Sequence, residues 1–517
     1  MTMSKFDRRH FLRAAGALGV LGPATPFALQ LAAAGSAAGQ TAPDYKALVC
    51  IFLFGGNDSN NVILPTDTDS WSRYFAARNT GNDPIALMPV GTAPIAAGAV
   101  SPITGRTAAR NTPEFWGGVL PLVPNTPNPV PAGTNATART FGIHPFLAPV
   151  KNIFDQGRLA VVANVGTLIR PTTKAQYQAR SVPIPANLFS HNDQQSTWQA
   201  GATEGVRVGW GGRFGDVLGS MNGTNTLFTA ISTAGNAVFL SGRNIIQYQM
   251  TTAAQPAVVV NAASSTTLFG STLGPARVRD IIQDTTGSSL YQQDYSSVVG
   301  RSMASASTLN TSFTQAAVTS IPAPAAYTNQ ITGNVEANSL ATQLQTVARM
   351  IAANATLGLR RQIFFVSLGG WDTHDFQNTA QPNLLGKVAH AMAYFDGVLA
   401  NIGGLNMRNN VTTFTASDFS RTYNTNGDGT DHAWAGHQFV MGGAVKGKDM
   451  YGQFPTVGVD MGTFRNPDFA GNAMVPTIAV DQYAGTMGRW FGVSDADMDT
   501  IFPNLRTFST RNLGFMT

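Results

Sequence analysis

Short apolar runs that alternate with helical patterns constrain the fold of this chain more than any other feature. Four runs rich in β-branched or aromatic residues end in polar, Gly-rich turns, and a fifth is a further candidate; they span 48–54, 159–165, 363–368, 411–416 and 438–445. Patterns with helical period span 145–154, 339–357 and 384–402. Strands that alternate with helices predict a mostly parallel sheet covered by helices on both faces. We therefore expect an α/β sandwich.

Two segments depart from this alternation. Residues 66–140 contain many Pro, Gly and Asn residues, which predicts a long loop-rich surface excursion. Residues 220–335 are rich in Thr, Ser, Ala, Asn and Gln and carry few charges, which indicates an inserted β-rich or loop-rich subdomain, or a cap over the site. The organisation that we predict is one α/β domain over 41–517 with these two additions.

The N-terminal segment is typical of an export signal. Residues 7–13 read D-R-R-H-F-L-R, and an uncharged stretch rich in Ala, Gly and Leu follows to about residue 34. A basic amphipathic helix or a membrane anchor is the alternative, but Gly and Pro between 16 and 26 make this stretch weakly hydrophobic and poorly helical. We interpret 1–40 as a removable twin-arginine signal. The translocase of that pathway is then a partner during export, and the location is periplasmic or extracellular.

Composition excludes several classes of protein. The chain is 43% hydrophobic and 12% charged, which is typical of a globular chain with few charges. Its net charge of +5 is largely the signal's own, and no run of Lys and Arg interleaved with aromatic residues indicates a nucleic-acid partner. No further stretch approaches the length of a transmembrane helix, so we expect no stable membrane span in the mature protein. The single cysteine, Cys50, lies in an apolar run and predicts a buried, inert thiol.

Acidic and histidine side chains follow the predicted strands. Because the carboxyl ends of parallel strands meet at one edge of a sheet, these side chains are expected close together. Carboxylates and imidazoles bind Zn²⁺ or Mn²⁺, and carboxylates bind Ca²⁺. The candidate metal ligands are Asp58, Asp372, His374, Asp418, His432 and His437. For Asp58 the alternative is an Asx-turn that only ends the strand, and a neighbouring acid, Asp375, is a candidate helix cap.

Two further residues are candidates for direct contact with a substrate. Arg421 could hold an anionic group in a bidentate fork, or form a salt bridge to Asp418 or Asp431. The segment F-S-H-N-D-Q-Q-S at 189–196 supplies Ser190 as a metal-activated nucleophile, with His191 and Asp193 as alternative ligands or orienting groups.

Several of these motifs, in this order, resemble one known family. They are the twin-arginine signal, F-G-G-N-D-S-N-N, S-H-N-D-Q-Q, G-W-G-G-R, L-G-G-W-D-T-H, S-D-F-S-R-T, G-T-D-H-A-W-A-G-H and G-G-A-V-K-G. The chain is similar to the exported bacterial family labelled domain of unknown function 1501 over nearly its whole length, and the resemblance is weakest in 66–140 and 220–335.

The resemblance implies a fold and a metal site. The family is grouped with the alkaline phosphatase and sulfatase superfamily, whose parallel α/β sandwich carries a two-metal site at the strand ends. It implies Asp58 as the acid of the first strand, Asp372 and His374 as a later pair, and His432 or His437 as the last histidine. The chain departs from the pattern at Asp418, because phenylalanine follows it where a histidine is usual.

Two functions follow from these observations. The first is a metal-dependent hydrolase of phosphate or sulfate esters that acts outside the cytoplasm. The second is a catalytically degenerate sandwich that serves as an exported surface, assembly or polymer-binding protein. The low charge and the Thr- and Asn-rich middle of the chain favour the second function, because such surfaces pack against one another or against polymers. Self-association is therefore expected with it.

Overall fold

The computed structural model describes residues 45–131, 134–135, 137–253, 260–287 and 289–517. The predicted signal at 1–40 lies outside these residues.

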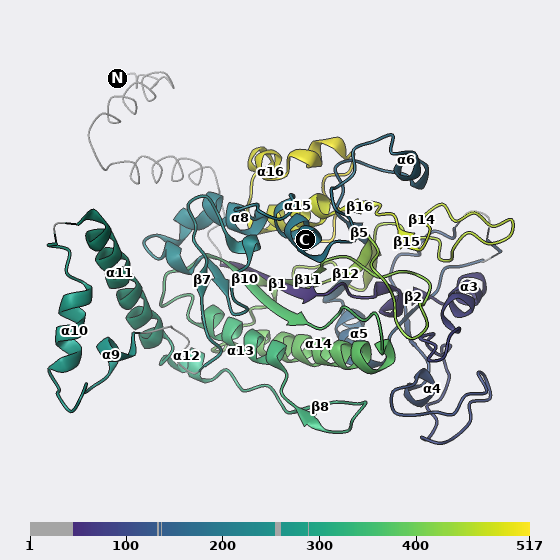
Figure 1. The fold of residues 1–517 in the computed structure, drawn as a ribbon, viewed down its shortest axis with the longest axis horizontal. Helices are drawn as coiled ribbons and strands as arrows, with labels where there is room; N and C mark the ends of the chain where they lie inside the picture. Colours follow the sequence, from purple (N-terminus) through teal and green to yellow (C-terminus); the bar gives the residue numbers. More distant parts are fainter. Residues whose placement is uncertain (1–44, 132–133, 136, 254–259, 288) are drawn as a thin grey trace.

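A nine-stranded mixed sheet forms the centre of the molecule (Figure 1). Its order is β13-β5-β12-β11-β1-β10-β6-β7, with β16 beside β5. The strands are β1 (Lys46–Phe54), β5 (Leu159–Gly166), β6 (Ala230–Ser232), β7 (Tyr248–Gln249), β10 (Arg361–Gly369), β11 (Val411–Ser417), β12 (Gly436–Met441), β13 (Asp449–Tyr451) and β16 (Ile478–Ala479). β1 is parallel to β10 and β11, whereas β12 is antiparallel to both β11 and β5. The five predicted strands and the mostly parallel α/β class are confirmed.

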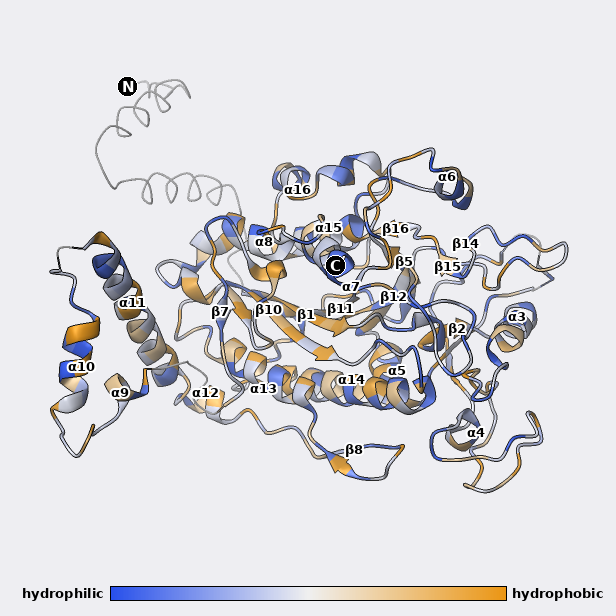
Figure 2. Ribbon diagram, in the orientation of Figure 1, coloured by the Kyte–Doolittle hydropathy of each residue, from blue (hydrophilic) through white to orange (hydrophobic). Residues whose placement is uncertain are grey.

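Helices cover both faces of the sheet because each central strand is apolar on both sides. In β1, Val49 and Ile51 belong to one core, and Leu48, Cys50 and Phe52 belong to the other. The first core includes α5 (Ala148–Asp155), α13 (Ser339–Ala352) and α14 (Gln377–Leu399); the second includes α8 (Trp210–Leu218), α15 (Val480–Phe491) and α16 (Asp495–Ile501). Figure 2 shows the hydrophobic strands between these two layers. Cys50 is buried as predicted, and burial raises the pKa of its thiol well above its usual value.

Shorter elements surround the sandwich. Over 66–140 the chain forms long loops with α3 (Thr68–Arg78), α4 (Pro113–Trp116) and β3 (Leu120–Leu122), and β3 joins β2 (Ile63–Pro65) and β4 (Phe141–Ile143) in a small sheet. The remaining α-helices and strands of the body are α6 (Lys174–Ala179), α7 (His191–Ala200), β14 (Phe469–Ala470) and β15 (Ala473–Met474). The 3-10 helices are η1 (Ser59–Asn61), η2 (Pro145–Leu147), η3 (Gly219–Asn222), η4 (Thr226–Phe228), η5 (Val238–Leu240), η6 (Arg408–Asn410) and η7 (Pro503–Thr507).

The middle of the chain is helical where we expected strands or loops. Residues 261–319 form α9 (Asn261–Ser264), α10 (Gly274–Ile282), α11 (Leu290–Ser312) and α12 (Ala316–Thr319), so the expectation of a β- or loop-rich insertion is wrong there. The long helix α11 buries only Ser296, Ala306, Leu309 and Ser312. A helix that buries so little carries a weak apolar period, which is why the sequence gives no helical signal. We call α9, α10 and α11 the helical arm; it lies to one side of the sheet, beyond β7 (Figure 1). A short hairpin of β8 (Tyr327–Thr328) and β9 (Val335–Glu336) follows.

Across the described part of the chain, every helix is too short or too polar to cross a membrane.

Candidate metal centre

Strand direction brings the candidate residues to one edge of the sheet. β1, β10 and β11 run parallel and in register, with Phe54 opposite Gly369 and Leu53 opposite Ser417, so the segments that follow them leave the sheet together. β12 runs the other way, and the residues that precede it therefore reach the same edge. His432 comes before β12, which is why it lies near residues that come after β10 and β11.

Gly55 allows two of these segments to approach each other. Its φ of +116° is unfavourable for other residues, and a Cβ there would lie 2.5 Å from the amide nitrogen of Asp372. The chain that leaves β1 can therefore pass directly against the chain that leaves β10.

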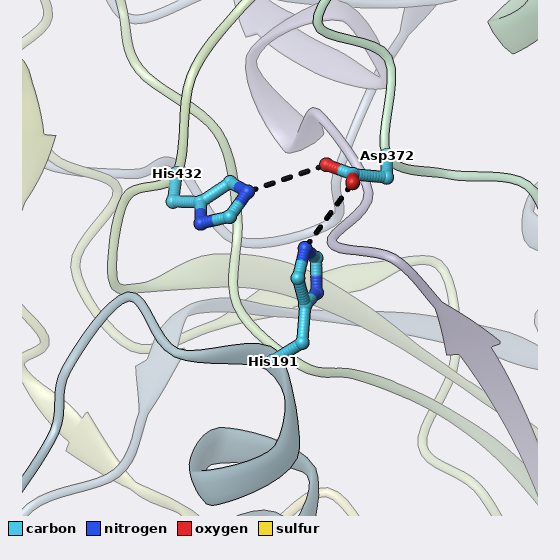
Figure 3. A group of neighbouring side chains, drawn as sticks. All are labelled: His191, Asp372 and His432. Carbon is cyan, nitrogen blue, oxygen red and sulfur yellow. Dashed lines mark hydrogen bonds and ion pairs between the residues drawn. The ribbon is translucent and has the colours of Figure 1, made fainter.

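Four side chains converge at this edge. His191, Asp372 and His432 each offer one ligand atom, and these atoms lie within 4.8 Å of one another (Figure 3). Nε2 of His191 is 3.3 Å from Oδ2 of Asp372, and Nε2 of His432 is 3.3 Å from Oδ1. Nε2 of His374 is 3.1 Å from the same Oδ1 and 2.9 Å from Nε2 of His432. Bonds of about 2.0–2.1 Å in a tetrahedral zinc site separate neighbouring ligand atoms by roughly 3.3 Å, which is the distance from Nε2 of His191 and of His432 to the oxygens of Asp372.

His191 is held by a buried carboxylate. Its Nδ1 is 2.7 Å from Oδ2 of Asp418, a fully buried carboxylate that also accepts hydrogen bonds from Gln195 Nε2 and from the amide of Gly55. An ionised carboxylate only accepts, so Nδ1 carries the hydrogen, and Nε2 is the atom that faces Asp372 and on which a metal ion would replace a proton. The hydrogen bond to Asp418 raises the pKa of His191 above its usual value. A histidine fixed by a carboxylate in this way is a common arrangement in metal sites.

His432 is held in the same tautomer by a backbone carbonyl. Its Nδ1 donates to the carbonyl oxygen of Phe189 over 2.7 Å, which leaves the lone pair on Nε2. Phe189 has a φ of +74°, an uncommon conformation for a bulky residue, in the turn that presents this carbonyl. Burial, together with the positive charges of His191 and Arg421, lowers the pKa of His432 below its usual value. The neutral imidazole, which is the form that binds metals, is therefore favoured.

His374 adds a third imidazole nitrogen beside the Asp372 carboxylate, and this group of acceptors can be stabilised by a cation. Its Nδ1 is 3.1 Å from Oδ1 of Asp431, so its Nε2 lone pair faces the Nε2 lone pair of His432 across 2.9 Å. Two lone pairs at this distance repel each other unless a proton or a metal ion lies between them. Nε2 of His191 is also buried and forms no hydrogen bond within the part of the chain that the structure describes. The residues present therefore fit a divalent ion.

Arg421 holds Asp372 in place. The guanidinium is 1% exposed, and its Nη1 donates to Oδ1 of Asp372 over 2.8 Å and to the carbonyl of Gly55 over 2.9 Å. Nε and Nη2 donate to the carbonyl of Thr430. Burial raises the pKa of Asp372, but the hydrogen bond and charge of Arg421 outweigh it, so the pKa is lowered and the carboxylate stays ionised. The bidentate contact with a substrate that the sequence suggested is not formed here, because the donors face the protein.

Asp58 lies in a different set of contacts. Both of its oxygens accept from the guanidinium of Arg78, Oδ2 also accepts from Gln377 Nε2, and Oδ1 accepts from the amide of Asn60. Asp58 and Arg78 are both fully buried side chains. The structure thus places the first-strand acid in an ion pair and, by the hydrogen bond to Asn60, in the Asx-turn given as the alternative.

His437 is also apart from the cluster. It lies within β12, is 5% exposed, and stacks on Phe454 with ring centroids 4.3 Å apart. Its Nδ1 accepts from the amide of Asn164 over 3.1 Å, and burial lowers the pKa of the ring to about 3. Of the two candidates for the last histidine, the structure brings His432 to the cluster.

Ser190 is next to two of the residues that build the cluster. It is the N-cap residue of α7, between Phe189 and His191, and its hydroxyl does not cap the helix. Its side chain hydrogen-bonds the carboxylate of Asp193 instead.

Sequence reasoning gave His191 only as an alternative ligand, and it did not pair His191 with Asp418. A signal was present: His191 and Gln195 are four residues apart at the start of a helix, so they share one face, and both contact Oδ2 of Asp418. In the family pattern a histidine usually follows the acid at position 418, and this chain has phenylalanine there. His191 of α7 lies beside Asp418 instead. Asp431, the partner of His374, was given only as an ion-pair partner for Arg421.

The fold and the cluster define an α/β protein with a mixed, mostly parallel sheet and a His–Asp group able to hold a metal ion at the ends of its strands. The chain belongs to the family described as "Protein of unknown function (DUF1501)", which matches residues 45–502. No curated protein and no solved structure matches the chain.

Proposed function

We propose that this protein is a metal-dependent hydrolase of phosphate or sulfate esters. The observation that carries the proposal is the convergence of His191, Asp372 and His432, two of them imidazoles held at Nδ1 so that their Nε2 atoms face the carboxylate. A set of two histidines and one carboxylate that leaves an open position is characteristic of catalytic rather than structural metal sites. The choice of esters rests on the resemblance alone, which groups this family with the alkaline phosphatase and sulfatase superfamily.

Each residue of the site would have a separate role in the reaction. His191, Asp372 and His432 would hold the ion, His374 would lie beside its open position, and the ion would supply Lewis-acid chemistry. Ser190, one residue from His191, is the candidate nucleophile, and a water molecule is the alternative. Asp418 and Arg421 would orient His191 and Asp372.

We also propose that the protein acts outside the cytoplasm, in the periplasm or beyond, after export by the twin-arginine translocase. The support is the D-R-R-H-F-L-R segment at 7–13 and the uncharged stretch that follows it. Replacing Arg8 and Arg9 by lysine is expected to leave the chain in the cytoplasm, which fractionation and immunoblotting would detect. Unchanged export of this variant would contradict the route.

The hydrolase is tested by metal content and turnover together. Protein purified without chelator is expected to contain zinc, manganese or calcium and to hydrolyse p-nitrophenyl phosphate or sulfate. Replacing His191 and His432 by glutamine should remove both properties. His390→Gln is the matched control, since His390 is a half-buried histidine of α14 outside the cluster. Absence of metal, and turnover that survives the double substitution, would refute the proposal.

A second function, an exported surface, assembly or polymer-binding protein, is favoured by the helical arm. Large apolar side chains are strongly exposed there: Phe269, Leu273, Ile281, Leu290, Tyr291 and Tyr295. Exposed apolar patches of this kind often mark interaction sites. This function predicts assembly that survives the double histidine substitution, and a strictly monomeric protein with ester turnover would contradict it.

A further inference from the structure

A pocket lies away from the cluster, between four elements of the fold. It is lined by residues that follow β5, by the C-terminal end of α7, by the start of α15 and by η7, and it encloses about 230 Å³. The only charged side chain in its lining is Asp481, the second residue of α15. Its other polar side chains include Thr167, Thr197 and Asn504.

The Asp481 carboxylate lacks a partner. The residue is 8% exposed, and within the described residues no hydrogen bond or ion pair reaches its side chain. An unpaired buried carboxylate is costly, and this burial raises its pKa to about 7. A cation in the pocket would offset that cost.

Two of the three threonine hydroxyls in the lining, those of Thr167 and Thr197, can act only as acceptors toward a ligand; the third belongs to Thr203. Thr197 Oγ1 donates its hydrogen to the carbonyl of Asp193 over 2.7 Å, and Thr167 Oγ1 donates its hydrogen to Gln194 Oε1 over 2.9 Å. Each hydroxyl oxygen has a further lone pair for a donor from the pocket, even though Thr167 Oγ1 also accepts weakly from a tryptophan. The C-terminal end of α7, at Gly201, and the N-terminal end of α15, at Asp481, bring helix dipoles of opposite sign to the pocket, so its attraction for a cation comes from the carboxylate.

The lining therefore matches a ligand with several N–H donors, a positive charge and an apolar stem. Leu168, Ile169 and Val480 form apolar walls beside these acceptors. A primary ammonium group has three donors and no acceptor, which suits one carboxylate and two hydroxyl oxygens. A divalent metal ion is a poorer match, because Ca²⁺ takes 6–8 oxygen ligands and Zn²⁺ prefers imidazole or thiolate.

We propose that this pocket binds a primary alkylammonium group, with the ammonium on Asp481 and Thr197 and the alkyl chain along Leu168, Ile169 and Val480. The ammonium belongs to a free amine or to a lysine side chain. The site is separate from the metal centre, so its existence does not depend on the hydrolase activity.

Calorimetric titration of the full protein at about pH 8, where the carboxylate is ionised, tests the proposal. n-Butylammonium is expected to bind saturably, and n-butanol, which has the same shape without the charge, at least tenfold more weakly. Asp481→Asn should weaken butylammonium binding at least tenfold, whereas Asp495→Asn, which removes an exposed carboxylate from the first turn of α16, should leave it unchanged. Thr197→Val keeps the shape and removes one acceptor, so a severalfold loss is expected.

Nα-acetyl-lysine methylamide identifies the source of the ammonium. Binding as tight as that of butylammonium assigns the pocket to a lysine side chain, and binding of butylammonium alone assigns it to a free amine. Equal binding of butanol and butylammonium, or butylammonium binding that survives both Asp481→Asn and Thr197→Val, would overturn the proposal.

Discussion

The Asp418→Asn substitution tests how the metal centre is built. Asp418 does not face the predicted ion; it fixes the Nδ1 hydrogen of His191 over 2.7 Å and so directs Nε2 toward Asp372. Asparagine has nearly the same shape and can still accept one hydrogen bond, but it lacks the charge that makes the imidazole a stronger ligand. Loss of such an orienting group typically lowers metal affinity 10–100-fold, or about 1.4–2.7 kcal/mol.

Two opposing effects have to be separated in the assay. The hydrogen bond to Asp418 raises the pKa of His191, so it strengthens the ligand but also favours the proton that competes with the metal. Above the histidine pKa this competition disappears, and at about pH 8 the substitution should show its full loss of affinity. Near pH 6 the loss should be smaller, because the variant histidine releases its proton more readily.

Competition with a chromophoric zinc chelator measures the affinity at both pH values. Asp155→Asn is the control, since Asp155 is a surface carboxylate whose ion-pair partner is the half-buried Lys151. Circular dichroism would establish that both variants are folded. An affinity at pH 8 that equals that of the unmodified protein would refute the assignment of His191 as a ligand oriented by Asp418.

Three further predictions follow from the structure. Elemental analysis should give about one divalent ion per chain rather than two, since the oxygens of Asp58 are taken by Arg78; two equivalents would contradict this. Arg78→Met leaves a buried carboxylate without a partner and should lower the free energy of unfolding by about 3–5 kcal/mol in urea titrations. Arg277→Met, which breaks an exposed ion pair, should change it by less than about 1 kcal/mol, and equal effects would contradict the buried-pair argument. Asp481 has a pKa raised from 3.8 to about 7, so the unfolded chain releases its proton first, and this residue lowers stability as pH rises between those values. Asp481→Asn should therefore stabilise the protein by roughly 2–3 kcal/mol more at pH 8 than at pH 5 in urea unfolding, and a gain independent of pH would contradict the raised pKa.

Local pattern was sufficient for much of the architecture. The runs that became β1, β5, β10, β11 and β12 are fully buried strands, and such strands are continuous apolar segments that can be recognised in isolation. The helices α13 and α14 pack one apolar face on the sheet, so their period was visible as well. The helical arm escaped prediction because α11 buries only four small or apolar residues.

The same distinction holds for the metal centre. Asp372 and His374 were found because they lie just past β10, where the parallel part of the sheet brings loops together, and His432 because it lies in a dense group of Asp and His residues just before β12. His191 was undervalued because its place depends on the start of α7 and on a carboxylate 227 residues further along the chain.

What the sequence by itself determined is the α/β class, the position of the edge where the chemistry gathers, and the kinds of side chain available there. Those properties follow from the period of apolar residues and from the residue types beside it. Only the tertiary structure decided which side chains meet. The reversed direction of β12 brings His432 to the cluster, Arg78 forms an ion pair with Asp58, and Arg421 forms an ion pair with Asp372. The physical reason is that a carboxylate or an imidazole acquires its role from the groups that surround it. Those groups lie from 20 residues away in the sequence, for Asp58 and Arg78, to 227 residues away, for His191 and Asp418.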